Sequence, residues 1–306
     1  MLLSFFSILF GLLIGSFLSV CIYRIPLGRG SGLEELSPEQ EGQEDILEPA
    51  QDRDKNSPFF DRKVTISWPP RSFCPGCGKE LRWFHNIPFF SWVFLGGKCG
   101  YCKERISVRY PFIELLSAAL CYFAFLQFDP LTALIVYLLA CMLVVISFID
   151  LDYFIIPNVI TYPGTLIGFL VAGVNEFTDL FGPPITPGLL SALLGVLVGA
   201  GFLLIISEGY LRLRKKQGLG MGDVKLLAVL GAFLGPEAAF YTIFVGSLLG
   251  TVLGVFMLVV GRNRLNQYLP FGPSLAIAAL LYLYTGPLVL IEITRFLGSS
   301  MQGLFN

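Results

Sequence analysis

Residues 131–152 read LTALIVYLLACMLVVISFIDLD, and this stretch decides the fold class. Its apolar run is long enough for a helix that crosses the roughly 30 Å hydrocarbon core of a bilayer, which takes about 20 residues. The apolar residues are continuous and do not alternate with a period of two, which argues against a transmembrane barrel. The run ends in two acids, Asp150 and Asp152. It therefore predicts a membrane helix with carboxylates at one end.

The rest of the chain has the same character. Of its 306 residues, 55% are hydrophobic and 14% are charged, and the mean hydropathy is +0.72. These values exclude an ordinary soluble domain, and a net charge of -1 gives no general attraction for nucleic acid. We expect an all-α polytopic membrane protein with about eight transmembrane helices and with the sixth and seventh separated at Gly235-Pro236. The expected helices lie near residues 1–23, 111–128, 131–149, 157–175, 187–209, 223–237, 238–260 and 271–294.

The basic residues predict the topology. If the loops alternate across the membrane, all but one of the 21 Lys and Arg residues fall on the same side as residues 24–110, and the exception is Arg295. Because short cytoplasmic loops are enriched in Lys and Arg, we expect that side to be the cytoplasm and both chain ends to lie outside. Residues 1–23 lack the basic start and the cleavage site of a signal peptide, so we expect them to remain as the first transmembrane helix.

The expected cytoplasmic domain, residues 24–110, has two parts. Residues 30–61 are acidic and poor in large apolar side chains, which is typical of a solvated linker. Residues 72–105 then carry two CxxC pairs, which are Cys74 with Cys77 and Cys99 with Cys102. This spacing predicts a zinc-ribbon-like site in which four thiolates hold one zinc ion. Disulfides are the alternative, and the reducing cytoplasm disfavours them.

A third acid, Asp223, follows the glycine-rich run Gly218-Leu219-Gly220-Met221-Gly222, and the topology places it on the same membrane face as Asp150. Ionisable residues at membrane helices are costly and are candidates for function. Two neighbouring carboxyl groups share a proton, so one can activate water while the other protonates a carbonyl oxygen. A favourable charge at a helix N-terminus is the alternative for Asp223. The single histidine, His85, and the lack of HExxH give little support to histidine-based or zinc-based hydrolysis.

The sequence from Gly220 to Leu226, GMGDVKL, is similar to the GxGDxKL motif of the bacterial type IV prepilin peptidase and N-methyltransferase family, a group of GxGD aspartyl peptidases. Other matches follow in family order along the chain. They are residues 15–26, GSFLSVCIYRIP; 85–92, HNIPFFSW; 109–114, RYPFIE; 149–150 with 156–158, ID and IPN; and 269–273, LPFGP.

The resemblance implies a bifunctional enzyme of the bacterial inner membrane. Such an enzyme cleaves the leaders of type IV prepilins or pseudopilins at the cytoplasmic face, then methylates the new N-terminus with S-adenosylmethionine. It also implies that residues 111–296 form a transmembrane aspartyl peptidase domain in which Asp150 and Asp223 are catalytic. Asp152 is offset from these positions, and we expect it to be an accessory group or a helix-end charge. Asn158 stands where many members have an aspartate, and the 30–61 segment is longer than the usual spacer.

Glu114 is the one candidate for the methyl-transfer site, where it could hold the substrate's ammonium group or accept its proton. A plain interfacial charge beside Arg109 is the alternative. Two other functions stay open for the whole chain. One is a peptidase without methyl transfer, and the other is a non-enzymatic membrane scaffold or transporter with a zinc ribbon. The sequence does not indicate which pilin is processed, whether a pilus, a secretion system or DNA uptake is served, or the oligomeric state.

Overall fold

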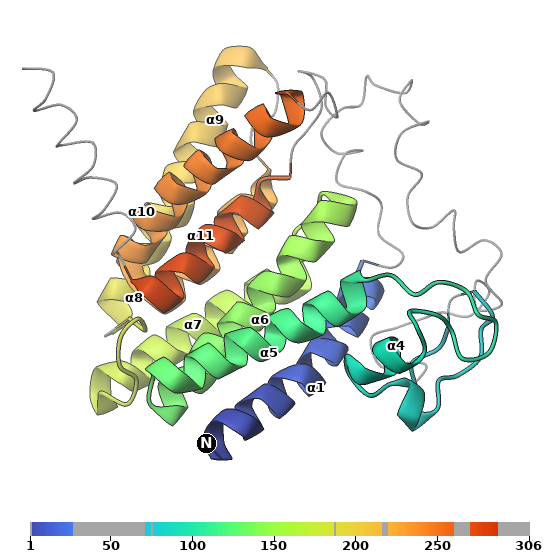
Figure 1. The fold of residues 1–306 in the computed structure, drawn as a ribbon. Coiled ribbons are helices and arrows are strands. Elements are labelled where there is room, and N and C mark those ends of the chain that lie inside the picture. Colours follow the sequence, from blue (N-terminus) through green and yellow to red (C-terminus); the bar gives the residue numbers. More distant parts are fainter. Residues whose placement is uncertain are drawn as a thin grey trace, which may run out of the picture. The chain divides into compact units, whose positions relative to one another are not determined.

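The computed structural model describes residues 2–26, 71–74, 76–186, 188–215, 220–259 and 270–286. Within these ranges the regular secondary structure is helical, and two isolated β-bridges lie in the segments between helices. The α-helices are α1 (Leu2–Arg24), α4 (Phe90–Phe94), α5 (Arg109–Gln127), α6 (Pro130–Tyr153), α7 (Asn158–Thr178), α8 (Leu189–Val196), α9 (Phe202–Arg214), α10 (Met221–Val259) and α11 (Gly272–Thr285) (Figure 1). A 3-10 turn, η1 (Trp83–His85), precedes α4, and a π-helical turn, η2 (Leu197–Gly201), joins α8 to α9.

The expected all-α membrane fold is confirmed, but the count of eight spans is not. Five helical stretches in the described residues are long and apolar enough to cross a membrane: α1, α5, α6, the continuous Leu189–Leu213 stretch of α8 and α9, and α10. The expected spans 223–237 and 238–260 both lie in α10, in which two helices meet at a kink where Gly235 has a non-helical backbone conformation. The described part of α11 has only 14 residues. The acidic linker 30–61, the end of the last expected helix and Arg295 lie outside the described residues.

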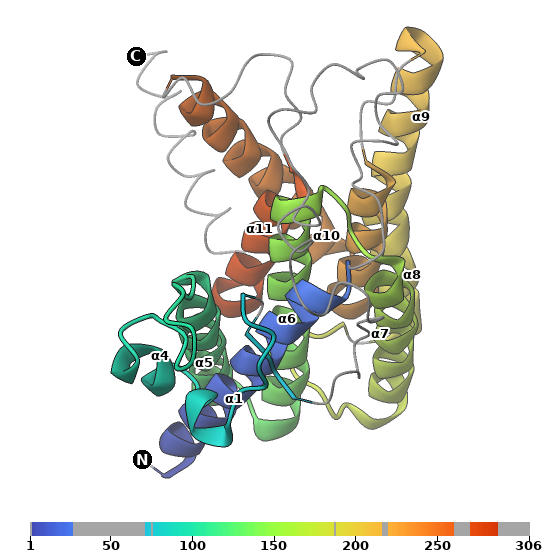
Figure 2. The same ribbon diagram turned by 90° about the vertical axis from the view of Figure 1, so that its right-hand side faces the viewer.

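The break expected at Gly235-Pro236 is present as a kink within α10. Gly235 has φ 80° and ψ -174°, a conformation that L side chains rarely adopt. Pro236 has no backbone N–H to donate to the preceding turn, so the regular helix cannot pass through this point. The two arms of α10 consequently run in different directions (Figure 2).

The described chain divides into two compact units. Unit 1 comprises Met1–Leu126 and Tyr137–Ile155, and unit 2 comprises Gln127–Val136 and Ile156–Asn306. The long helix α6 therefore begins in unit 2 and ends in unit 1. Of the two aspartates singled out from the sequence, Asp150 belongs to unit 1 and Asp223 to unit 2.

Small residues bring α1 and α5 together in unit 1, where the two helices lie side by side (Figure 1). A Cβ atom added to Gly11 would lie 2.5 Å from the Cα atom of Ala118, and one added to Gly15 would lie 2.6 Å from the Cα atom of Glu114. Such contacts allow the two backbones to approach closely, as in small-xxx-small packing between membrane helices.

In unit 2, α10 packs against α7, α8 and α11. The closest approach is between Gly195 on α8 and Gly231 on α10, because a Cβ atom on either residue would overlap the backbone of the other. Gly168 on α7 similarly faces Ala232, whose Cβ atom would lie 2.8 Å from an added Cβ. Glycines at these positions therefore allow α7 and α8 to pack closely against α10.

Candidate functional site

The four cysteines of the two CxxC pairs form one cluster in unit 1. Their sulfur atoms all lie within 4.8 Å of one another, and the Sγ atoms of Cys74 and Cys102 are 3.8 Å apart. A tetrahedral zinc ion with Zn–S bonds of about 2.3 Å requires sulfurs about 3.8 Å apart. The cluster therefore fits a four-thiolate zinc site. The remaining three cysteines, Cys21, Cys121 and Cys141, are buried in helices outside the cluster.

The two CxxC pairs lie in matching hairpins related by an offset of 25 residues along the chain. In the first, the Cys74 N–H donates to the Lys79 carbonyl and the Gly78 N–H donates to the Cys74 carbonyl. In the second, the Cys99 N–H donates to the Glu104 carbonyl and the Lys103 N–H donates to the Cys99 carbonyl. The equivalent turn residues, Gly78 and Lys103, have φ angles of 66° and 61°. Each hairpin thus aims two thiols at the same point with the same backbone geometry.

The segment between the hairpins packs onto them and completes the cysteine lobe (residues 71–74 and 76–108). The His85 ring lies against Gly100, where an added Cβ would be 2.9 Å from its Nε2 atom, and meets the Tyr101 ring edge to face. Trp92 donates its indole N–H to the Ile106 carbonyl at 3.1 Å. His85 is not part of the sulfur cluster.

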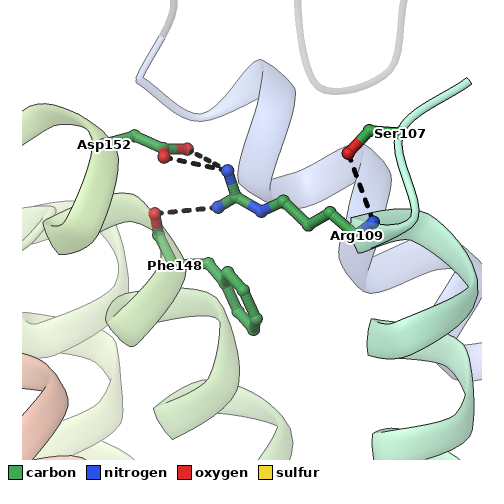
Figure 3. A network of polar contacts seen from close by, with 4 residues as sticks. All are labelled: Ser107, Arg109, Phe148 and Asp152. Carbon is green, nitrogen blue, oxygen red and sulfur yellow. Dashed lines mark hydrogen bonds and ion pairs between the residues drawn. The ribbon is translucent and has the colours of Figure 1, made fainter. Parts of the chain in front are cut away.

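Asp150 lies near the C-terminal end of α6 and is only 6% exposed. Asp152, two residues on, faces Arg109 at the start of α5 in the same unit (Figure 3). The Nη1 atom of Arg109 donates to both carboxylate oxygens of Asp152, and Nη2 donates to the Phe148 carbonyl at 3.0 Å. The guanidinium also lies 4.6 Å from the centre of the Phe148 ring. Asp152 is thus engaged in an ion pair that fastens the end of α6.

Asp223 lies in the first turn of α10 and is 8% exposed. The glycines before it allow close packing, since a Cβ atom on Gly222 would lie 2.9 Å from the Cβ of Ile156. Lys225, one half-turn further on, donates to the side-chain oxygen of Asn158 at 2.8 Å. Asn158, which departs from the expected aspartate, therefore ties the start of α7 to the start of α10.

Glu114 and Arg109 have different hydrogen-bond partners. Arg109 is paired with Asp152, whereas Glu114 is 8% exposed and accepts the Phe89 N–H at 2.7 Å. Phe89 has a φ angle of 61°, which is uncommon for a residue with a side chain. The loop before α4 thus adopts a strained conformation at the point where its N–H meets the buried carboxyl group of α5.

Comparison with known proteins agrees with this arrangement of motifs. Residues 9–128 match the bacterial peptidase A24 N-terminal domain, and residues 137–255 match the type IV leader peptidase family. The chain belongs to the type IV leader peptidase family. The stretch that matches the family contains both Asp150 and Asp223, and the N-terminal match contains the cysteine lobe and Glu114.

Curated relatives of this leader peptidase family member cover almost its whole length. A protein from Aeromonas salmonicida is 34% identical over 91% of this chain and 89% of its own length. One from Pseudomonas putida is 33% identical over 94% of this chain and 92% of its own, and one from Pseudomonas aeruginosa is 36% identical over 95% and 93%. Each of these proteins is named prepilin leader peptidase/N-methyltransferase. No solved structure matches the chain significantly.

Proposed function

We propose that this multi-pass membrane protein is a bifunctional enzyme that cleaves the leader of type IV prepilins or pseudopilins and then methylates the new N-terminus. Its family membership supports the substrate class. The observation that carries the chemistry is the pair of buried aspartates at the ends of two membrane helices, Asp150 on α6 and Asp223 on α10. The scaffold or transporter alternative does not account for this pair of aspartates. It also does not fit a family of leader peptidases.

Asp150 and Asp223 act in this proposal as the catalytic dyad of an aspartic peptidase. The ionised carboxylate takes a proton from water, whose oxygen attacks the scissile carbonyl carbon while the protonated partner donates to the carbonyl oxygen. Collapse of the tetrahedral intermediate breaks the C–N bond, and the leaving nitrogen takes up a proton. Asp152 has no part in this chemistry because Arg109 engages its carboxylate.

Zinc serves the cysteine lobe as a structural ion. Cys74, Cys77, Cys99 and Cys102 hold it, and four thiolates leave no open position for catalysis. S-adenosylmethionine, when bound, supplies an electrophilic methyl group to the new amine. The amine must be neutral to react, and Glu114, a buried acid on α5 in unit 1, can receive its proton or hold its ammonium form.

The cysteine lobe and the dyad face the cytoplasm of a bacterial cell, in the inner membrane. This orientation rests on the distribution of the basic residues, which gather on the side of residues 24–110.

Mass spectrometry of a prepilin co-expressed with this protein tests both activities. We expect a mature pilin that lacks its leader and carries one added methyl group on its N-terminus. Cleavage without methylation would leave only the peptidase part of the proposal. An intact prepilin, recovered beside stably inserted protein, would favour the scaffold or transporter function.

A further inference from the structure

The short helix α4 of the cysteine lobe has an apolar outer face. Phe90, Val93 and Phe94 share one side of this helix by their i, i+3 and i+4 spacing, and all three side chains are exposed, Phe94 by 84%. Trp92 instead binds within the lobe, where its indole N–H donates to the Ile106 carbonyl. A helix at a surface that faces water usually has a polar outer side. The outer side of α4 suits an apolar medium.

The turn η1 extends this surface, because it lies against α4. Its Trp83 side chain is 80% exposed, and the ring of Phe84, also exposed, meets the Trp83 ring edge to face at 5.7 Å. Exposed apolar side chains that gather in this way mark interaction sites. The apolar face of the lobe is defined here as Trp83, Phe84, Phe90, Val93 and Phe94.

The lobe that bears the apolar face is basic. Its described residues include six Lys and Arg residues and two acids, and all eight side chains are exposed. Four thiolates around one divalent zinc ion carry two negative charges, so the lobe stays positive with the metal bound. Arg82 directly precedes Trp83, and its guanidinium lies 6.0 Å from the centre of the Phe84 ring. Aromatic side chains beside basic ones are typical of surfaces that lie in the interface of an anionic bilayer.

A hydrogen bond places the start of α4 beside the membrane helix α5. The Phe89 N–H, immediately before α4, donates to the side chain of Glu114 at 2.7 Å. Because α5 has only 19 residues, about 28 Å of helix, it barely crosses a hydrocarbon core of about 30 Å. Its first residue, Arg109, must therefore lie close to the boundary of the core, and Glu114 lies about 7.5 Å further along the helix. Interfacial helices bury their apolar side to a similar depth, about 5–10 Å.

We propose that the apolar face of the cysteine lobe inserts into the bilayer leaflet that α5 enters, and that the basic residues of the lobe bind its anionic phospholipid headgroups. A second copy of the lobe fits this surface less well, because it would bring two positive surfaces together. The apolar helix of a pilin would cover the aromatic side chains but leave the basic ones without a counter-charge. The lobe is thus held at the membrane surface by its own side chains as well as by α5.

Quenching of tryptophan fluorescence by lipid tests the insertion. The full-length protein is reconstituted, without pilin, in vesicles of phosphatidylcholine and phosphatidylglycerol in equal amounts, with or without bromine on the acyl chains. The chain has three tryptophans, so the difference between the wild type and Trp83→Phe isolates the emission of Trp83. We expect brominated lipid to remove most of this emission and acrylamide, a quencher dissolved in the water, to remove little.

Two variants of Phe94 separate insertion from folding. Phe94→Glu puts a carboxylate on the apolar face, so it should lift the lobe away from the lipid, lower the quenching of Trp83 by brominated lipid and raise the quenching by acrylamide. Phe94→Leu keeps the face apolar and should behave like the wild type. Phe94 is 84% exposed, so neither change should unfold the lobe, and an equal zinc content in both variants verifies this.

The inference is overturned if acrylamide quenches Trp83 and brominated lipid does not, since the apolar face would then lie in water and be open to a protein partner. It is also overturned if Phe94→Glu is quenched like Phe94→Leu. Vesicles of phosphatidylcholine alone test the part played by charge, because lipid quenching of Trp83 should be weaker there. Equal quenching in the two kinds of vesicle would remove anionic headgroups from the inference.

Discussion

Arg109 donates from a single nitrogen, Nη1, to both carboxylate oxygens of Asp152 at 2.8 and 2.6 Å, across 43 residues of sequence. Both side chains are about one third exposed, at 32% and 35%, so the pair itself stabilises the fold by about 1 kcal/mol at most. The ion pair matters mainly because it holds the C-terminal end of α6 in place. The same guanidinium binds the Phe148 carbonyl, two residues before the buried Asp150.

We therefore expect Arg109→Ala to lower kcat for leader cleavage more than Asp152→Asn does. Asp152→Asn removes one partner, whereas Arg109→Ala removes the ion pair, the bond to Phe148 and the contact with its ring. The expected losses are less than about fivefold for Asp152→Asn and about tenfold or more for Arg109→Ala. Cleavage kinetics on a synthetic prepilin peptide measure both. A larger loss in Asp152→Asn would contradict the positioning role.

The dyad makes a stronger prediction. Asp150→Asn and Asp223→Asn should each reduce cleavage by about 10²-fold or more, because neither carboxylate alone can both activate water and protonate the carbonyl. Both variants should insert in the membrane and elute like the wild type on size exclusion. Asp152→Asn is the matched control on α6. An active Asp150→Asn beside an inactive Asp152→Asn would show that the pair is wrongly assigned.

Removal of the metal should affect the two activities unequally. Cys99→Ser takes one ligand from the cluster, so zinc content measured by elemental analysis should fall and the cysteine lobe should become protease-sensitive. Methylation should fall further than cleavage, because the two aspartates lie on helices outside the lobe.

Cys121→Ser, which changes a buried cysteine of α5 outside the cluster, is the matched control for Cys99→Ser. It should keep the metal and both activities. Freshly purified, reduced wild-type protein without zinc would rule out the metal assignment. A Cys99→Ser protein that loses cleavage first and still methylates pre-cut pilin would show that the lobe supports the peptidase site instead.

The matching hairpins predict opposite effects at two equivalent turn positions. Lys103 has a φ angle of 61°, which costs a residue with a Cβ about 1–2 kcal/mol, so Lys103→Gly should stabilise the lobe by about 0.5–1 kcal/mol after the entropy of glycine is included. Gly78→Ala, with a φ angle of 66°, should destabilise it by about 1 kcal/mol. Rates of zinc release to a chelator report both changes. Equal rates in the two variants would contradict the equivalence of the hairpins.

Helix packing in unit 2 gives a prediction about stability alone. Gly231→Ala places a methyl group into the backbone of α8 at Gly195, so the thermal unfolding midpoint should fall. Gly209→Ala on α9 has nothing within 4 Å and should leave the midpoint unchanged or raise it slightly. A Gly231→Ala protein as stable as Gly209→Ala would mean that α8 and α10 can separate at little cost.

Much of the architecture could be predicted from the sequence because it follows from local patterns. The spacing of Cys74, Cys77, Cys99 and Cys102 predicted the cluster, and Gly235-Pro236 predicted the kink of α10. The number of spans was harder to predict. Hydropathy marks the apolar stretches but not the length of each helix, and five stretches of the described residues are long and apolar enough to cross a membrane.

The tertiary partners of the polar groups could not be predicted in the same way. Arg109 and Glu114 lie five residues apart, so the sequence suggested that they lie beside each other. In the structure, Arg109 pairs with Asp152 and Glu114 accepts the backbone N–H of Phe89. The latter contact depends on a positive φ angle at a phenylalanine, for which no residue preference gives a signal.

The segment from Cys77 to Cys99 closes as a loop when the two hairpins share one ion, and this loop carries the Phe89 N–H to the buried carboxyl group of Glu114. Binding equilibria that share a folded element are reciprocal, so each ligand must tighten the other by the same factor. We therefore expect the methyl donor to retard loss of zinc. In a cell that lacks zinc, new pilins would lose their leader but keep an unmethylated amino terminus. The methylated fraction would therefore report the zinc supply at the time when the pilins were processed.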